Sequence, residues 1–189
     1  MRKVKLQMQV SLDGYVAGPN GEMDWMVWNW DDQLKDHVAR LTESVDCIVL
    51  GRHLAEGFIP HWANAAANPT PEEGDFARKM TDTPKIVFSR TMQTAPWPQT
   101  ALAGDDLRGE LARLKALDGG DIIVYGGAEL VSGLIREGLI DEYNLFVNPV
   151  ILGAGMPIFR ARAERQALDL VEARAFACGI VGMRYQPKS

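Results

Sequence analysis

The segment from Asp121 to Phe159 constrains this chain more than any other. It opens with Asp121 to Tyr125, a short apolar run rich in β-branched residues, which is typical of a strand buried on both faces in a parallel sheet. Gly126 and Gly127 follow directly, and from Leu130 to Leu139 leucine and isoleucine recur at helical spacing. The pattern therefore predicts a strand, a tight glycine turn and a helix in immediate succession.

Gly126 and Gly127 are open to two interpretations. Without Cβ atoms, the backbone can adopt conformations closed to other residues, or come close to a ligand. Because the pair precedes a helix, free amides and the helix dipole would favour an anion there. The first interpretation is a phosphate site, and the second is a strand-to-helix turn that binds nothing.

Short apolar strands alternate with helical segments along the chain, which argues for a mainly parallel sheet covered on both sides. The strands are expected at residues 3–10, 46–50, 85–88, 100–103, 121–125 and 140–147, with a short extended piece at 15–17 inside a loop. Residues 168–177 and 180–186 alternate in polarity around Cys178-Gly179, and they predict a closing antiparallel hairpin. The expected fold is therefore an α/β fold with a mixed sheet.

One helix is expected to begin at Asp31-Asp32, and another is expected to begin with a cap at Asp105. Three further helices are expected at residues 54–58, 72–80 and 130–139. Residues 59–75 contain three prolines and show little periodicity, so they are expected to form a long surface loop.

Length and composition favour one domain, residues 1–189. The net charge of −5 and the scattered bases argue against a nucleic-acid partner. No apolar run approaches the ~20 residues of a membrane span and no signal-like start is visible, so we expect a cytoplasmic protein. His37, His53 and His61 show no metal-ligand spacing, and we expect no metal site.

Three tryptophans, Trp25, Trp28 and Trp30, lie within six residues and precede Asp31 and Asp32. Because a buried indole N–H needs a partner, such a cluster often lines a cleft, and we expect these rings to contact substrate. The two acids have two interpretations: a helix cap that stabilises the dipole, or a carboxylate facing the cleft, where desolvation would raise its pKa.

Two further strand ends resemble the glycine turn. Gly51-Arg52-His53 follows one buried strand, and Ser89-Arg90-Thr91 follows another. Arginine and hydroxyl side chains at such positions suit a phosphate, although a surface arginine and a solvated turn are the plainer interpretations. Asp13, which precedes Gly14, is expected to form a turn more often than to act in catalysis.

The motifs of several enzyme classes are absent from the sequence. There is no G-x-S-x-G elbow, no G-x-x-x-x-G-K-[ST] phosphate loop and no G-x-G-x-x-G after the first strand. A serine hydrolase, a P-loop enzyme and an ordinary dinucleotide-binding Rossmann domain are therefore disfavoured.

Five segments together resemble one family over nearly the whole chain: SLDGYVAG, VLGRH, KIVFSRT, VYGGAELVSGLI and LIDEYNLFVNPVILGAGMPIF. The family is that of the dihydrofolate reductase-like proteins, in particular stand-alone relatives of the C-terminal reductase domain of the bifunctional riboflavin-biosynthesis deaminase/reductase. The resemblance implies a three-layer α/β fold, with a mixed central sheet of about eight strands that ends in an antiparallel hairpin.

The resemblance also implies NADPH as the hydride donor and a Gly126-Gly127 peptide bond in the cis form. Beside the 2′-phosphate and the pyrophosphate it places Gly51, Arg52, His53, Ser89 and Arg90. Along the pyrophosphate and nicotinamide side it places Gly126, Gly127 and Ala128, and Glu129 is the last of the implied cofactor-binding residues.

For the substrate, the resemblance implies a contact from Asp13 and a binding or catalytic acid at Asp31 or Asp32. The chain departs from the family pattern at Leu54 and Ala55, where threonine and an aromatic residue are common. A hydroxyl that could donate to the pyrophosphate is lost there, although the Leu54 backbone amide remains.

The resulting hypothesis is an NADPH-dependent reductase of a pterin- or pyrimidine-type ring, with 5-amino-6-(5-phosphoribosylamino)uracil as the substrate that the resemblance implies. The protein would hold the cofactor against the acceptor carbon, and an acid would orient or protonate the acceptor. Dihydrofolate reductase activity and a non-catalytic binding protein of the same fold are the alternatives. The resemblance further implies a homodimer.

Overall fold

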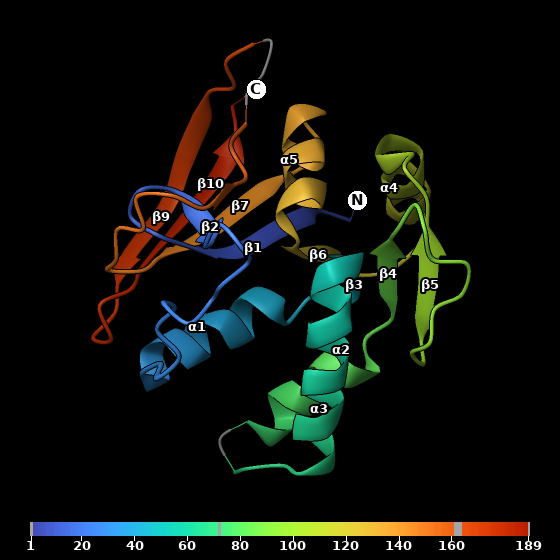
Figure 1. The fold of residues 1–189 in the computed structure, drawn as a ribbon, viewed down its shortest axis with the longest axis horizontal. Coiled ribbons are helices and arrows are strands. Elements are labelled where there is room, and N and C mark those ends of the chain that lie inside the picture. The colour runs from blue at the N-terminus through green and yellow to red at the C-terminus, as the bar shows by residue number, and fades with distance from the viewer. Residues whose placement is uncertain (1, 72, 161–163, 189) are drawn as a thin grey trace.

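The computed structural model describes residues 2–71, 73–160 and 164–188 of the chain. An eight-stranded sheet in the order β5-β4-β3-β6-β1-β7-β10-β9 forms its centre (Figure 1). Its strands are β1 (Val4–Val10), β3 (Val45–Gly51), β4 (Lys85–Phe88), β5 (Thr100–Ala103), β6 (Asp121–Gly126), β7 (Glu142–Val147), β9 (Leu168–Ala175) and β10 (Val181–Pro187). A separate pair joins β2 (Tyr15–Ala17) to β8 (Met156–Pro157).

The prediction of a mixed sheet with a closing antiparallel hairpin is confirmed. All neighbouring pairs from β5 to β7 are parallel. Strand β10 runs antiparallel to both β7 and β9, so the hairpin closes one side of the sheet.

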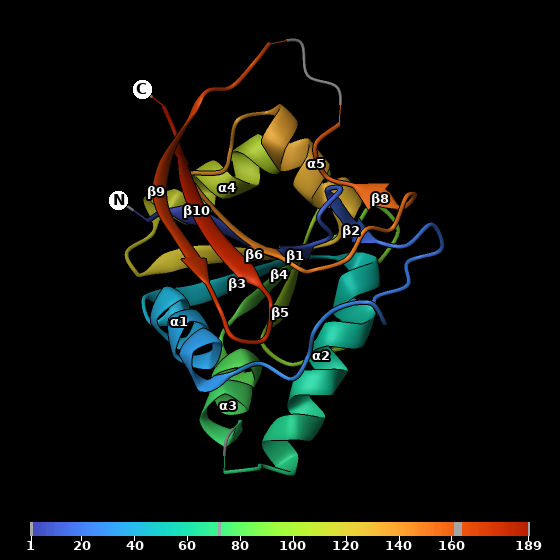
Figure 2. The ribbon, with the colours of Figure 1, turned by 90° about the vertical axis from the view of Figure 1, so that its left-hand side faces the viewer.

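Helices cover both faces of the sheet (Figure 2). One face carries α1 (Asp32–Thr42), α2 (Arg52–Ala67) and α3 (Gly74–Asp82), and the other carries α4 (Leu107–Ala116) and α5 (Ala128–Arg136). Within β3, Cys47 and Val49 pack under α4 and α5, while Ile48 and Leu50 pack under α2 and α3. Successive side chains of a strand point to opposite faces, so a strand covered on both sides must be apolar throughout.

The expectation of a surface loop over residues 59–75 is wrong. Helix α2 continues through Pro60 to Ala67, and α3 begins at Gly74. Ala55 and Ile59 are buried against the sheet, whereas Pro60 lies on the exposed side of the helix. Packing of the apolar face therefore outweighs the low helix propensity of proline. Glu72, at which a helix was expected to start, lies outside the described residues.

The predicted cap of α4 is wrong by one residue. The Asp106 carboxylate, not that of Asp105, accepts a hydrogen bond from the Gly109 amide at 2.8 Å. Among the described helices, none combines the length and the hydrophobicity that crossing a membrane requires.

Pro60 lacks the amide that would bond the Glu56 carbonyl, so α2 contains one missing hydrogen bond. We expect Pro60→Ala to raise the free energy of unfolding by about 1–2 kcal/mol, because the restored helix bond exceeds the entropy gained by the unfolded chain. Urea unfolding monitored by circular dichroism measures the change. Pro98→Ala, in the exposed turn before β5, is the matched control and should lower stability slightly. A loss of stability in Pro60→Ala would contradict this account of α2.

Candidate active site

The carboxyl ends of β4, β3, β6, β1 and β7 lie next to one another at one edge of the sheet, because these strands are parallel neighbours. The three turns that the sequence singled out follow β4, β3 and β6, which are consecutive in the sheet. The fold thus brings together turns that are far apart in the sequence. In parallel α/β sheets, ligands bind outside this edge.

Gly51 and the Gly126-Gly127 turn approach each other closely. A Cβ atom on Gly51 would lie 3.0 Å from the backbone nitrogen of Gly127, so a larger residue would push the two turns apart. Gly126 has a φ angle of 134°, which favours glycine, and a Cβ atom there would lie 3.1 Å from Leu54 Cδ2. Gly127, in contrast, faces open space, because a Cβ atom at this position would have no neighbour within 4 Å. The Gly126-Gly127 peptide bond is cis, as the resemblance implies.

Gly51 and Gly127 are the N-caps of α2 and α5, and neither helix start carries a side-chain cap. The amides of both first turns therefore lack a capping acceptor, and the positive ends of two helix dipoles meet at this point. Such a pair of helix starts suits an anion.

Arg52 connects the turn after β3 to the turn after β4. Its Nη1 atom donates to Thr91 Oγ1 at 2.8 Å, and its Nε atom lies 3.4 Å from a Glu56 carboxylate oxygen. Ser89 Oγ accepts hydrogen bonds from the Thr91 and Met92 amides at 3.2 and 3.0 Å, which fixes the second turn. Thr91 was not among the expected cofactor-binding residues, although its place beside Ser89 and Arg90 in the sequence was the signal for it.

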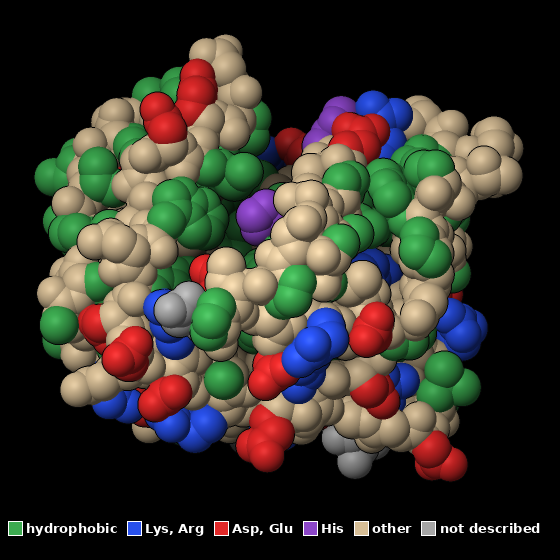
Figure 3. Space-filling model, turned by 90° about the horizontal axis from the view of Figure 1, so that it is seen from below, with side chains coloured by type: hydrophobic (Ala, Val, Ile, Leu, Met, Phe, Trp, Pro, Cys, Tyr) green, Lys and Arg blue, Asp and Glu red, His purple; other side chains and the backbone are tan. Residues whose placement is uncertain are grey.

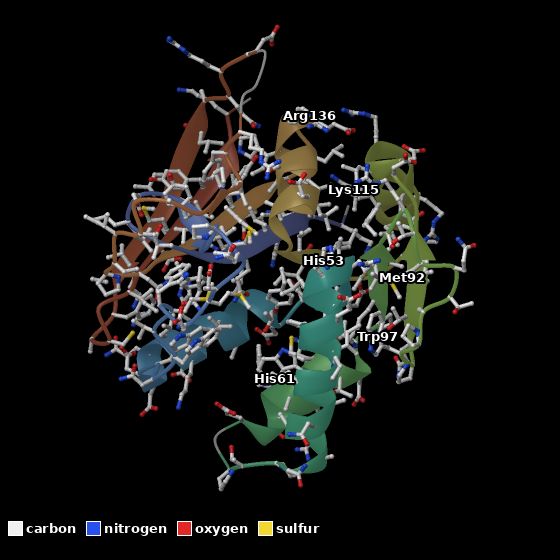
Figure 4. All side chains as sticks on the ribbon, in the orientation of Figure 1. His53, His61, Met92, Trp97, Lys115 and Arg136 are labelled. Carbon is white, nitrogen blue, oxygen red and sulfur yellow. The ribbon has the colours of Figure 1, made fainter. Side chains whose placement is uncertain are left out.

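The remaining predicted cofactor-binding residues surround these turns. The His53 side chain is 85% exposed and lies at the start of α2, near the base of α5 (Figure 4). Arg90 is exposed, and Ala128 packs against the core under α5. The exposed Glu129 carboxylate forms an ion pair with Arg160 Nη2 at 2.7 Å, and Arg160 lies outside the three turns.

Asp13 closes the loop after β1 against the loop after β7. Its carboxylate accepts hydrogen bonds from Ser11 Oγ at 2.7 Å, from the Leu152 amide at 3.1 Å and from the Gly153 amide at 2.7 Å. The Ser11 hydroxyl and these amides hold the pKa of Asp13 below its ordinary value. This geometry favours the structural interpretation of Asp13 over a direct contact with substrate.

Asp31 caps α1 and also ties it to the hairpin. One carboxylate oxygen accepts from the Leu34 amide at 2.9 Å, and the other accepts from the Cys178 amide at 3.0 Å. Together these amides lower the pKa of Asp31, with Leu34 the larger cause. The interpretation of Asp31 as a desolvated acid with a raised pKa is therefore wrong, because amide donors outweigh the loss of water. The Asp32 side chain is exposed and forms no hydrogen bond or ion pair with the other described residues.

The three tryptophans differ in their exposure. Trp25 and Trp30 are half-buried, and their indole nitrogens donate to the carbonyls of Glu22 at 3.0 Å and Val27 at 2.7 Å. Trp30 packs against the core between α1 and the hairpin. Trp28 is 63% exposed, so its ring is the one accessible to a ligand.

A buried amide that the sequence did not reveal as a site residue lies between β1, β7 and the tryptophan segment. Asn148 is fully buried, its Oδ1 atom accepts from the Val27 amide at 2.8 Å, and its Nδ2 atom donates to Gln9 Oε1 at 3.0 Å. The only sequence signal for Asn148 was its place directly after a strand at this edge. It holds the tryptophan segment over the ends of β1 and β7.

The surface on this side is hollowed between α1 and α2 (Figure 3). His61 projects from α2 toward the side on which α1 lies (Figure 4). Among the described residues, no three His, Cys, Asp or Glu side chains gather where they could hold a metal ion.

A mixed eight-stranded sheet with a C-terminal antiparallel pair, and with glycine turns at its carboxyl edge, defines the dihydrofolate reductase-like fold. The family model of the RibD C-terminal domain matches residues 2–182, and the chain belongs to this family. The uncharacterized protein YyaP of Bacillus subtilis (strain 168) is 34% identical over 188 residues, which cover 97% of this chain and 94% of that protein.

Two longer proteins extend the comparison. The riboflavin biosynthesis protein RibD of Corynebacterium ammoniagenes is 25% identical over 159 residues, which cover 82% of this chain but 45% of that protein. A deaminase/5-amino-6-(5-phosphoribosylamino)uracil reductase of Thermotoga maritima shares the fold, with a TM-score of 0.68 and 18% identity, over 99% of this chain and 57% of that one. This chain therefore corresponds to about half of each of these two relatives.

The lowered pKa of Asp31 makes its contribution to stability depend on pH. The ionised carboxylate stabilises the fold above the ordinary aspartate pKa, and this stabilisation is lost as the pH falls through the lowered value. We expect Asp31→Ala to melt several degrees below the wild type at a pH of about 7, with the difference shrinking toward a pH of about 2. Differential scanning calorimetry measures both melting temperatures. Asp36→Ala, an exposed acid on the same helix, is the control, and a gap that does not depend on pH would contradict the cap assignment.

Proposed function

We propose that this protein is an NADPH-dependent reductase of a pyrimidine- or pterin-type ring. The observation that carries the proposal is that three turns suited to an anion lie side by side. They follow β4, β3 and β6, which are neighbours in the sheet. A dinucleotide carries phosphates at separate points along its length, and one isolated turn would not hold them. Membership of the RibD C-terminal domain family supports a reductase.

The residues at these turns fit the cofactor. Gly51 and Gly126 are glycines where a Cβ atom would meet backbone or Leu54, and Gly127 faces open space, so a pyrophosphate can approach both helix starts. Arg52, oriented by Thr91, is a cation suited to the 2′-phosphate. Leu54 offers only its backbone amide to the pyrophosphate, because it replaces the family hydroxyl.

When bound, NADPH supplies the hydride that reduces the substrate ring. Gly126, Gly127 and Ala128 hold the pyrophosphate and nicotinamide side, and the segments after β1 and β7 hold the substrate beside it. We assign Asp32 as the acid that orients or protonates the acceptor, because the carboxylates of Asp13 and Asp31 are engaged by backbone amides.

Isothermal titration calorimetry with NADPH tests the proposal directly, and no binding at about millimolar cofactor would end it. We expect Gly127→Val to abolish NADPH binding, because its side chain would enter the space through which the pyrophosphate reaches the helix amides. The fold should persist, since a Cβ atom at this position meets nothing within 4 Å. Gly104→Val, at another open glycine, is the control and should bind normally. Retained binding in a folded Gly127→Val variant would contradict the assignment of this turn.

Arg52 should distinguish NADPH from NADH. We expect Arg52→Ala to weaken NADPH binding by about 10–100-fold, the value of a charged hydrogen-bonding contact, and to leave NADH binding nearly unchanged. Titrations with both cofactors measure the ratio. Arg108→Ala removes an arginine that bonds the Glu137 carbonyl instead, and it is the control. Equal losses for the two cofactors would show that Arg52 does not contact the 2′-phosphate.

A further inference from the structure

The hairpin of β9 and β10 has one polar face and one apolar face. Side chains that are paired across neighbouring strands share a face. Tyr185 of β10 pairs with Tyr143, which lies in the core under α4 and α5, whereas Gly182 pairs with Phe146, which packs against α1. The face on the α5 side therefore consists of Leu168, Leu170, Ala173 and Ala175 in β9 and of Val181, Met183, Tyr185 and Pro187 in β10.

No described helix covers this apolar face. In Figure 1, α4 and α5 both lie to the right of the hairpin rather than over it. Leu170 is 57% exposed, Leu168 is 38% exposed and Val181 is 37% exposed. Ala173 and Ala175 are exposed as well. A continuous apolar face on a soluble chain marks an interaction surface, because large apolar patches are uncommon on monomers.

The side chains of this face indicate what covers it. None of the eight is charged, so a partner that met them with a charged side chain would bury that charge without a counterion. Arg160, Glu164 and Arg165, which line a hollow beside Leu168 at one end of the face, carry charges of both signs. The surface that fits the eight side chains is therefore apolar and extended, as the face itself is.

Side-chain size changes along the face in a way that fits a second copy. The bulky end carries Leu168, Leu170 and Tyr185, and the small end carries Ala173, Ala175 and Val181. When two sheets pack face to face, large side chains fit over small ones of the opposite sheet. A two-fold axis across the strands produces this fit at both ends, because it places the bulky end of each copy on the small end of the other.

We propose that two copies of this chain form a dimer through the apolar faces of their β9-β10 hairpins, with the two-fold axis running across the strands. The match to YyaP covers 94% of that protein, so this relative has no further domain that could cover the face, which supports a second copy as the occupant. The inference concerns assembly and does not depend on the proposed reductase activity.

Sedimentation velocity of the full chain measures the dimer. We expect a dimer at about 10 μM chain, within the affinity range of specific interfaces. Leu170→Lys should raise the dissociation constant at least about 100-fold, because the symmetric contact buries the new charge twice. Asp169→Lys introduces the same side chain at the neighbouring residue, on the opposite face, and this matched control should still form the dimer. A wild type that is monomeric at about 100 μM would overturn the inference. Dimeric Leu170→Lys or monomeric Asp169→Lys would do the same.

Ala173→Trp distinguishes a packed interface from general hydrophobic adhesion. The indole adds apolar area, so adhesion would become stronger, whereas at the small end it would collide with a bulky side chain of the partner. We expect this variant to weaken the dimer at least about tenfold. Circular dichroism melting of each variant checks that the fold persists, as expected because Leu170 and Ala173 are exposed in the single chain. An unchanged or a tighter dimer in Ala173→Trp would contradict the proposed packing.

Discussion

The contact between the end of β3 and the turn after β6 is the constraint on which the rest of the structure depends. The two strands are neighbours, Leu50 is paired with Gly126, and the register shifts just before this pair. No side chain separates the two turns, since a Cβ atom on Gly51 would lie 3.0 Å from the Gly127 nitrogen. Helices α2 and α5 therefore start from one point on opposite faces of the sheet. An anion at this point meets the positive ends of both helices.

Much of the fold follows from local patterns. Buried parallel strands appear as continuous apolar runs, and the closing hairpin appears as alternation around Cys178-Gly179, so both were predictable. Helix α2 was not, because Pro60 is a strong local signal against a helix, while the packing of Ala55 and Ile59 that overrides it is visible only in three dimensions. The cap of α4 was missed for a smaller reason, since Asp105 and Asp106 are chemically identical candidates.

The candidate site was predictable in its parts and not in its arrangement. Each turn follows a strand in the sequence, but only the strand order places β4, β3 and β6 side by side. The acids were harder to interpret. Whether a carboxylate such as that of Asp31 is desolvated or bonded to amides depends on the hairpin, whose Cys178 lies far along the chain. Asn148 carried almost no signal, because a polar residue after a strand usually faces water.

The hydrogen bonds from the Leu152 and Gly153 amides to the Asp13 carboxylate join two loops. The bonded residues lie 139 and 140 positions apart in the sequence. The same loops also touch near Gly155, where a Cβ atom would lie 2.3 Å from the Ala17 carbonyl oxygen. Neither loop can lengthen or shorten alone without pulling the Leu152 and Gly153 amides away from the carboxylate. Insertions and deletions in these two loops should therefore occur together among related proteins, so that the shape of the substrate side changes in paired steps from one relative to another.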